Sequence, residues 1–206
     1  MESGLQILVR DYYERKISQF GASPKGVDWN SEESQTLRFE KLTFLLDQKN
    51  CFTINDIGCG YGRLVQFLED KSFDYSYCGW DLSEKMITKA KMNHKDNSNV
   101  EFLTGTKADK IADYTIASGI FNVRQIISDK IWLKYILKML NNFDSFSLKG
   151  FAFNCLSSYS DEDKKKDYLY YADPIFFFDY CKRNYSKNVS LLHDYDLYEF
   201  TMIVKK

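Results

Sequence analysis

Residues 56–62 place an acidic side chain before three glycines on alternate positions, directly after the apolar segment 51–54. An amphipathic segment, 64–68, follows at once, so the pattern predicts a strand, a glycine turn and a helix. Glycine lets the backbone turn tightly and approach a ligand closely, because it has no Cβ. The free N–H groups of the following helix point back at the turn. This spacing therefore predicts that a small ligand binds against the turn.

The register of the glycines helps to identify the ligand. The dinucleotide pattern G-x-G-x-x-G requires glycine at position 63, where Arg63 stands, and the third glycine comes one position early, at Gly62. Asp56, directly before the loop, is not part of the dinucleotide pattern either. An NAD(P)-dependent oxidoreductase is therefore the less favoured alternative, and a plain tight turn of another α/β protein is a further one.

A second acidic residue follows the next predicted strand. The segment 75–80 ends on Asp81, and Ser83 stands where a helix N-cap is expected. A carboxylate offers two acceptor oxygens, so Asp81 can accept the hydrogens of both ribose hydroxyls. A helix-capping or loop carboxylate is the commoner role for a lone Asp, but the position after a glycine loop favours the ribose.

The form D-x-G-x-G-x-G, together with Gly79-Trp80-Asp81-Leu82-Ser83, resembles the class I S-adenosylmethionine (SAM)-dependent methyltransferases over about residues 50–206. In that family the loop packs on the amino-acid end of the cofactor, S-adenosyl-L-methionine, and the second acid holds its ribose. The resemblance implies a cofactor site formed by Asp56, Gly58, Cys59, Gly60, Gly62, Arg63, Asp81, Leu82, Thr106, Ser118 and Gly119.

Two further predicted strands, 100–104 and 112–118, complete the implied site. Thr106 stands where many family members carry an Asp that holds the adenine amino group. The Thr106 hydroxyl or the backbone near it would then make this contact. The tip of the strand 112–118 lies beside the substrate in the family, which makes Ser118, Gly119 and Asn122 substrate-side candidates. The D/N-P-P-Y form of many base N-methyltransferases is absent.

The rest of the chain predicts the architecture. A helix over 131–140 and a buried strand over 150–155 precede a helix from Pro174, with Asp173 as its N-cap. The predicted strands 188–193 and 197–204 are so close in sequence that they must form an antiparallel hairpin. The resemblance implies an α/β, Rossmann-like class I methyltransferase fold. Its seven-stranded, mostly parallel sheet has the order 3-2-1-4-5-7-6, with a terminal antiparallel hairpin and N-terminal lid helices.

The chain of 206 residues fits one domain, with residues 1–48 as an N-terminal helical cap and 49–206 as the SAM-binding core. Two helices are expected in the cap, one from Leu5 to near Gly21 and one from 31 to 46. Family members often use such helices as a lid, and simple packing against the sheet is an equal alternative. The polar and aromatic cap residues Tyr12, Tyr13, Arg15, Lys16 and Trp29 form an unusual set.

The composition argues against several classes of binding partner. A net charge of −1 argues against a general electrostatic grip on nucleic acid. We expect no membrane association, because no apolar run is long enough to cross a bilayer and the N-terminus lacks the apolar core of a signal peptide. Five cysteines without C-x-x-C spacing predict reduced thiols in a cytoplasmic protein, and no metal site is expected.

The catalytic candidates lie after three different strands. Methyl transfer from a sulfonium needs mainly a positioned nucleophile and the exclusion of water. Asn122 follows the fourth strand, Tyr159 the fifth and His193 the sixth. His193 is the candidate base, since its ordinary pKa lies close to neutrality, and a structural histidine is an equal alternative. The other histidine, His94, lies in a polar segment and is predicted to be solvated.

Several phrases, among them 117–123, 151–155 and 191–195, resemble bacterial small-molecule methyltransferases of unassigned substrate. Relatives of this kind occur in surface-polysaccharide gene sets. The predicted function is therefore SAM-dependent methylation of a small polar metabolite, at oxygen rather than nitrogen, with a sugar or sugar-linked phosphate precursor as the implied class. A non-catalytic SAM-binding partner subunit is an alternative reading, and a homodimer stays open.

Overall fold

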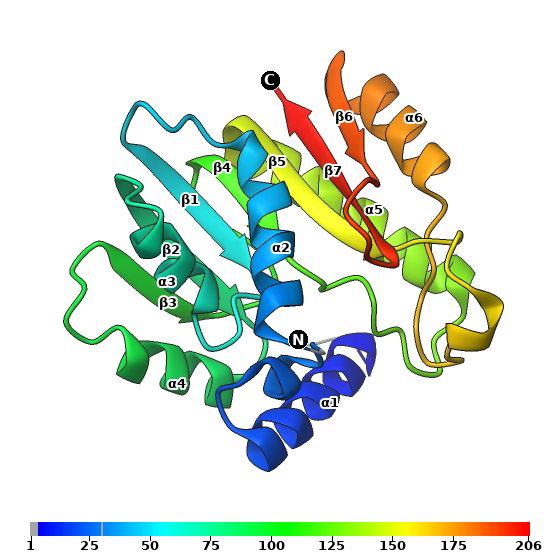
Figure 1. Ribbon diagram of the computed structural model, residues 1–206, viewed down its shortest axis with the longest axis horizontal. Coiled ribbons are helices and arrows are strands. Elements are labelled where there is room, and N and C mark those ends of the chain that lie inside the picture. The colour runs from blue at the N-terminus through cyan, green and yellow to red at the C-terminus, as the bar shows by residue number, and fades with distance from the viewer. Residues whose placement is uncertain (1–3, 30) are drawn as a thin grey trace.

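The computed structural model describes residues 4–29 and 31–206, which form one twisted sheet with helices on both faces (Figure 1). The strands are β1 (Phe52–Ile57), β2 (Tyr75–Asp81), β3 (Val100–Thr104), β4 (Ala112–Ala117), β5 (Ser147–Leu156), β6 (Asn188–Leu192) and β7 (Glu199–Lys205). The helices are α1 (Gly4–Phe20), α2 (Glu32–Leu42), α3 (Arg63–Asp70), α4 (Glu84–Asn93), α5 (Asp129–Phe146) and α6 (Pro174–Asn184). Short 3-10 helices cover Pro24–Val27, Thr43–Leu45 and Glu162–Lys164.

The sheet has the order β3-β2-β1-β4-β5-β7-β6. Strands β1 to β5 pair in parallel, whereas β7 runs antiparallel to both of its neighbours, β5 and β6. Both the predicted sheet order and the predicted terminal hairpin are confirmed. The carboxyl ends of the five parallel strands consequently meet at one edge of the sheet, where open α/β sheets bind ligands.

Apolar side chains divide into two buried clusters, one on each face of the sheet. The first joins α2, α3 and α4 to residues such as Ile54 and Ile116. The second joins α5 and α6 to residues such as Phe151 and Phe153. Because helices cover both faces, the central strands β4 and β5 are buried along most of their length, as is typical of parallel sheets.

The helix starts follow the caps that the sequence predicts. The Ser83 hydroxyl accepts a hydrogen bond from the Met86 amide at 3.3 Å at the start of α4. The Asp173 carboxylate accepts hydrogen bonds from the amides of Ile175 and Phe176, and Pro174 occupies the first position of α6. These caps satisfy amides that a helix start otherwise leaves unpaired, which fixes where each helix begins.

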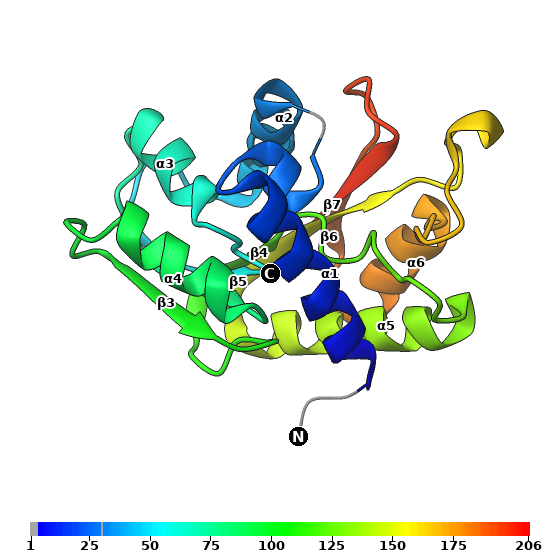
Figure 2. The ribbon, with the colours of Figure 1, turned by 90° about the horizontal axis from the view of Figure 1, so that it is seen from below.

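The N-terminal segment crosses the carboxyl edge of the parallel strands, with α1 in front of the sheet in Figure 2. Asp28 joins the end of the 3-10 helix Pro24–Val27 to α1. Its carboxylate accepts hydrogen bonds from the Tyr12 hydroxyl and from Lys16, both at 2.6 Å. Leu5 and Val9 pack against the second apolar cluster. Helix α1 therefore covers the edge at which a ligand is expected.

Candidate active site

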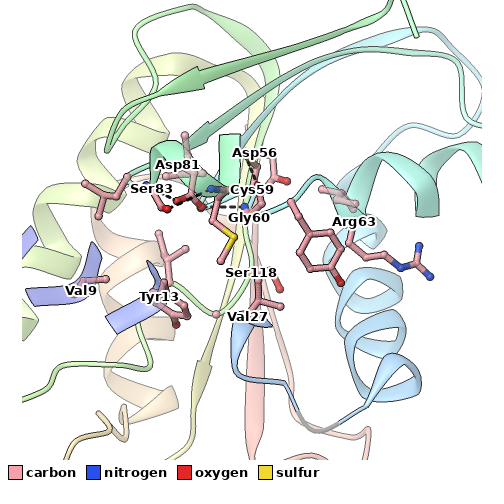
Figure 3. Close-up of a pocket in the computed structure, with 18 of the residues that line it drawn as sticks. Val9, Tyr13, Val27, Asp56, Cys59, Gly60, Arg63, Asp81, Ser83 and Ser118 are labelled. Atoms are coloured by element: carbon pink, nitrogen blue, oxygen red, sulfur yellow. Dashed lines mark hydrogen bonds between the residues drawn. The ribbon is translucent and has the colours of Figure 1, made fainter. Parts of the chain in front are cut away.

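Two adjoining cavities lie at the carboxyl edge of the sheet. The first is enclosed by the glycine loop after β1, the end of β2, the segments after β3 and β4, and the N-terminal segment (Figure 3). Of the predicted cofactor residues, those that line it are Asp56, Gly58, Cys59, Gly60, Arg63, Asp81, Leu82, Thr106, Ser118 and Gly119. Residues predicted from four separate segments thus come together around one space.

The glycine loop uses most of its own amides internally. The amides of Gly58 and Cys59 donate to the Trp80 carbonyl at 2.7 and 3.0 Å. The Gly60 amide donates to Oδ2 of Asp81 at 2.9 Å. These bonds fix the loop against the end of β2. A ligand can therefore pack closely against the loop and hydrogen-bond to its carbonyl oxygens, but not to these three amides.

Asp81 anchors the loop and faces the first cavity. Its Oδ1 accepts the Ser83 amide at 2.8 Å, while its Oδ2 accepts the Gly60 amide. Burial raises the pKa of Asp81 to about 6, against the lowering effect of these two amides. Each carboxylate oxygen can accept a second hydrogen bond, so the side chain retains two positions for hydroxyl donors in the cavity.

Asp56 is the second buried carboxyl group of the first cavity. The Tyr77 hydroxyl donates to its Oδ2 at 2.6 Å. Burial raises the pKa of Asp56 to about 7, the hydrogen bond from Tyr77 opposes this shift, and the nearby charge of Asp81 adds to it. The cavity therefore contains two carboxyl groups that gain or lose a proton close to neutral pH.

Two polar atoms at the first cavity are buried without a partner. Nη1 of Arg63 and Oγ of Ser118 make no hydrogen bond within the part of the chain that the structure describes. A buried donor or acceptor that stays unpaired is costly, and such atoms are rare in native proteins. Both residues line the cavity, so the site is equipped for a ligand that carries an anionic group and a polar partner for a hydroxyl.

A second cavity, of about 290 Å³, shares Tyr13, Val27, Trp29 and Gly119 with the first. Gly119 has a φ of +73°, and a Cβ there would lie 2.3 Å from the Trp29 ring. The indole also packs against the Arg38 guanidinium, whose Cζ lies 3.9 Å from the ring centroid. Trp29, held between Gly119 and Arg38, therefore forms the wall between the two cavities.

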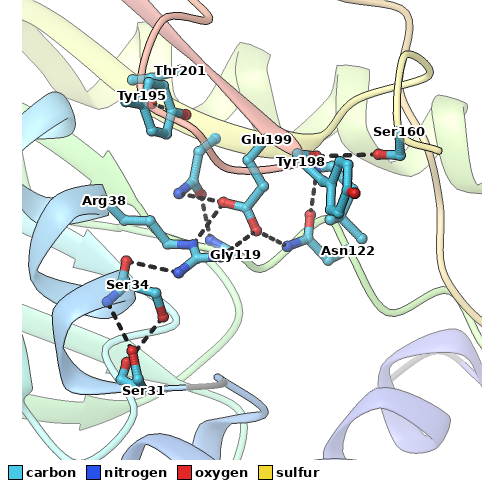
Figure 4. Close-up of polar contacts among 12 residues, drawn as sticks. Ser31, Ser34, Arg38, Gly119, Asn122, Ser160, Tyr195, Tyr198, Glu199 and Thr201 are labelled. Carbon is cyan, nitrogen blue, oxygen red and sulfur yellow. Dashed lines mark hydrogen bonds and ion pairs between the residues drawn. The ribbon is translucent and has the colours of Figure 1, made fainter. Parts of the chain in front are cut away.

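A buried polar network supports this wall (Figure 4). Glu199, only 1% exposed, pairs with Arg38 at 2.8 Å and also accepts the side-chain amides of Asn122 and Asn154 at 3.1 and 3.2 Å. Oδ1 of Asn154 accepts the amide of Gly119 at 2.6 Å. The network joins α2, β5 and β7 to the turn after β4, and so fixes the backbone at which the two cavities meet.

The predicted catalytic residues occupy different places. Asn122 lines the second cavity, and its amide group is held by two hydrogen bonds, since Nδ2 donates to Glu199 and Oδ1 accepts the Leu156 amide. Tyr159 is 68% exposed, and the exposed His193 lies near it, with ring centroids 6.1 Å apart. Neither of these two rings lines the cavities. The structure therefore brings only Asn122 of the three to the site.

The positions of Gly62 and His94 differ from what the sequence predicted. Gly62 does not line the first cavity; a Cβ there would lie 2.9 Å from the His94 ring. Nε2 of His94 lies 3.0 Å from the Gly62 carbonyl oxygen, and its ring packs near Phe102. The prediction that His94 is solvated is confirmed only in part: the residue is half-buried, because the end of α4 places its ring on the back of the glycine loop.

Some residues that line the cavities were not predicted as cofactor or catalytic residues. Tyr13 and Trp29 belong to the polar and aromatic set of the cap, which was the available signal. Arg38 and Glu199 lie 161 positions apart, and their side-chain types alone gave no sign of the pair.

Residues 54–138 match the methyltransferase domain family. A Mycobacterium tuberculosis protein, "Putative methyltransferase Rv1506c", is 49% identical over 155 residues, which cover 75% of this chain and 93% of that protein. The fold resembles magnesium protoporphyrin IX methyltransferase from Synechocystis with bound SAH (S-adenosylhomocysteine), with a TM-score of 0.71, 14% identity and 98% and 99% of the two chains covered. A SAM-dependent methyltransferase of Leishmania major gives a TM-score of 0.68 at 16% identity, covering 100% of this chain and 84% of that one.

The chain belongs to the class I SAM-dependent methyltransferases, and its cofactor is S-adenosyl-L-methionine. Within residues 4–29 and 31–206, no helix is long and apolar enough to span a membrane. The same residues contain no group of three or more His, Cys, Asp and Glu side chains that could hold a metal ion.

Proposed function

We propose that the first cavity binds SAM and that the second binds a small polar acceptor, which the enzyme methylates at oxygen. The observation that carries this proposal is that the two cavities adjoin at Tyr13, Val27, Trp29 and Gly119. A displacement at carbon requires the nucleophile to lie about 3–3.5 Å from the reacting atom and in line with the breaking bond. Adjoining cavities with a narrow shared boundary support that arrangement.

The lining of the first cavity fits the parts of the cofactor. Asp81 accepts hydrogen bonds from the ribose hydroxyls with its two remaining positions. The unpaired Nη1 of Arg63 binds the carboxylate of the amino-acid end, and the loop carbonyls with Ser118 accept its ammonium protons. Asp56 supports the loop from below, and the adenine lies near Leu82 and Thr106. Gly62 and Cys59 shape the turn rather than contact a ligand with their side chains.

The N-terminal segment acts as the lid of the site. Val9, Tyr13 and Val27 line the first cavity, which has a free volume of only about 100 Å³. Pockets for ligands of drug size have volumes of roughly 300–1,000 Å³. In this proposal the cap, predicted over residues 1–48, moves outward to admit the cofactor and returns to exclude water during transfer.

The second cavity supports a small, ring-shaped polar acceptor. Its aromatic lining includes Tyr13, Trp29, Tyr168 and Tyr171. Aromatic walls with a few placed polar groups are typical of small-molecule sites, and they suit a sugar or a sugar-linked phosphate precursor. Exposed His193 and Tyr159 would not contact an acceptor there, so they are not part of this proposal. Asn122 acts as a positioning residue through Glu199. A cytoplasmic location and a homodimer stay predictions.

Methyl-labelled SAM tests this function directly. The enzyme is incubated with separate pools of monosaccharides, sugar phosphates, nucleotide sugars and primary amines, and products are followed by mass spectrometry and by NMR of the labelled methyl group. The proposal expects an O-methyl signal from a hydroxylated acceptor. An N-methyl signal from the amine pool would overturn the choice of oxygen. Tight SAM binding without any labelled product would favour the non-catalytic partner subunit.

A further inference from the structure

The segment 157–173, between β5 and α6, forms the outer wall of the second cavity. Backbone hydrogen bonds hold it against the turn after β4. The Tyr170 amide donates to the Asn122 carbonyl at 2.8 Å, and the Arg124 amide donates to the Tyr168 carbonyl at 3.1 Å. The side chains of this wall are therefore placed by a fixed backbone.

Two carboxylates line the second cavity, and both are engaged with donors of the protein. Asp28 accepts the Tyr12 hydroxyl and the Lys16 ammonium, both at 2.6 Å. Glu199 accepts two hydrogen bonds from Arg38 and one from each of two asparagines. Neither carboxylate pairs with a cation of the outer wall.

The outer wall instead presents donors. Within the described residues the Lys166 ammonium has no carboxylate within 4.0 Å, and it lies 5.9 Å from the centre of the Tyr168 ring. The Tyr171 oxygen accepts the Lys166 amide at 2.9 Å, so its own O–H is left to donate. Lys165, by contrast, is paired with Glu162 at 2.5 Å.

We propose that the methyl acceptor carries an anionic group, a phosphate or a carboxylate, bound by Lys166, Tyr168 and Tyr171. Such a group offers only acceptor atoms, which matches a wall of unused donors and one unpaired positive charge. A neutral sugar hydroxyl would leave the Lys166 charge without a counter-charge, and each Glu199 oxygen already accepts two hydrogen bonds. The anion lies at the outer end of the cavity, and the hydroxyl to be methylated lies at the Trp29 end. This inference rests on the proposed function of the second cavity.

The test uses the full chain saturated with SAH and titrated with inorganic phosphate, acetate and glucose at low ionic strength. Binding is followed by calorimetry and by NMR of the aromatic side chains. We expect phosphate or acetate to bind better than glucose, and the preferred anion identifies the group. The variant Lys166→Gln should weaken anion binding about fivefold to tenfold, since the exposed ammonium acts through a solvent-screened, charge-assisted contact. Tyr171→Phe should weaken it by a smaller factor.

The matched control is Lys187→Gln, which removes the same charge from an exposed position outside the cavity. Circular dichroism and Tm verify that each variant is folded. Equal affinity for glucose and the anions, or anion binding that Lys166→Gln and Lys187→Gln change equally, would overturn the inference. The titration with SAH distinguishes a failure of the proposed function from a failure of the anionic-acceptor inference. Failure of SAH to bind would contradict the proposed function, whereas SAH binding without anion binding would contradict only the anionic acceptor.

Discussion

The two cavities differ in how the chain builds them. The part of the first cavity that holds Asp56 and Asp81 depends on short, contiguous stretches, the glycine loop and the end of β2. The second gathers side chains from the cap, α2, the turn after β4, the segment 157–173 and the start of β7. A site made of local motifs can be found in a sequence, whereas one made by folding distant side chains together requires the structure.

The largest expected effect comes from Glu199, on the side of the second cavity. Replacing Glu199 by Gln leaves the Arg38 guanidinium buried without its counter-charge, which costs about 3–5 kcal/mol in the free energy of unfolding. Urea denaturation measures this loss. Asp179→Asn is the control, because its exposed pair with Arg183 contributes roughly 0–1 kcal/mol. Equal losses in both variants would mean that the buried network does not hold the cavity together.

Asp81 provides the matching test of the first cavity. The variant Asp81→Asn keeps the shape of the side chain but removes its charge, so SAH should bind roughly 10- to 100-fold more weakly, as for the loss of about 1.5–3 kcal/mol from charged hydrogen bonds. Calorimetry on the folded variant measures this change. Asp70→Asn, at the exposed end of α3, should leave the affinity unchanged. Unaltered SAH affinity in folded Asp81→Asn would remove Asp81 from the site.

Gly119 lies where the two cavities meet. In Gly119→Ala, alanine must adopt the positive φ of Gly119, and its Cβ lies 2.3 Å from the Trp29 ring. We therefore expect a loss of about 2–3 kcal/mol in the free energy of unfolding, together with a change in tryptophan fluorescence. Gly21→Ala is a matched control, since Gly21 also has a positive φ, of +65°, but no atom within 4 Å of the added Cβ. The difference between the two variants isolates the contact with Trp29. No difference would mean that the indole is free to leave the wall.

The pH dependence sharpens the account of the first cavity. Burial raises the pKa of Asp81 to about 6 and that of Asp56 to about 7, from an ordinary 3.8. Between 3.8 and these values the folded protein binds more protons than the unfolded chain, so its stability falls as pH rises from about 4 to 7 and then levels off. SAH affinity should rise through pH 6, because the ionised Asp81 accepts hydroxyl hydrogens better.

Denaturation and calorimetry across pH 4 to 8 check both signs. In Asp56→Asn, most of the stability change between pH 6 and 7 should disappear, and only the contribution of Asp81 should remain. Stability that rises over this interval would show that the two carboxyl groups are stabilised as anions without a ligand.

The terminal hairpin and the caps at Ser83 and Asp173 were predicted from local patterns of apolar, turn and capping residues. The sheet order was predicted from the resemblance to class I methyltransferases, because no local pattern determines it. In the structure, ten of the eleven predicted cofactor residues line one cavity. Gly62 is the exception, since the loop turns it toward His94.

Side-chain direction and distant pairing were not predictable. His193 directly follows β6 at the carboxyl edge of the sheet, yet its ring lies outside both cavities. The pairing of Arg38 with Glu199 depends on how α2 packs beside β7, which no local pattern reports.

A crystal structure of the chain with SAH tests the central claim most directly. The account predicts SAH in the first cavity, with its ribose hydroxyls on Asp81, its carboxylate on Arg63 and its sulfur facing the boundary formed by Trp29 and Gly119. SAH bound elsewhere, or with its sulfur directed away from the second cavity, would contradict the account.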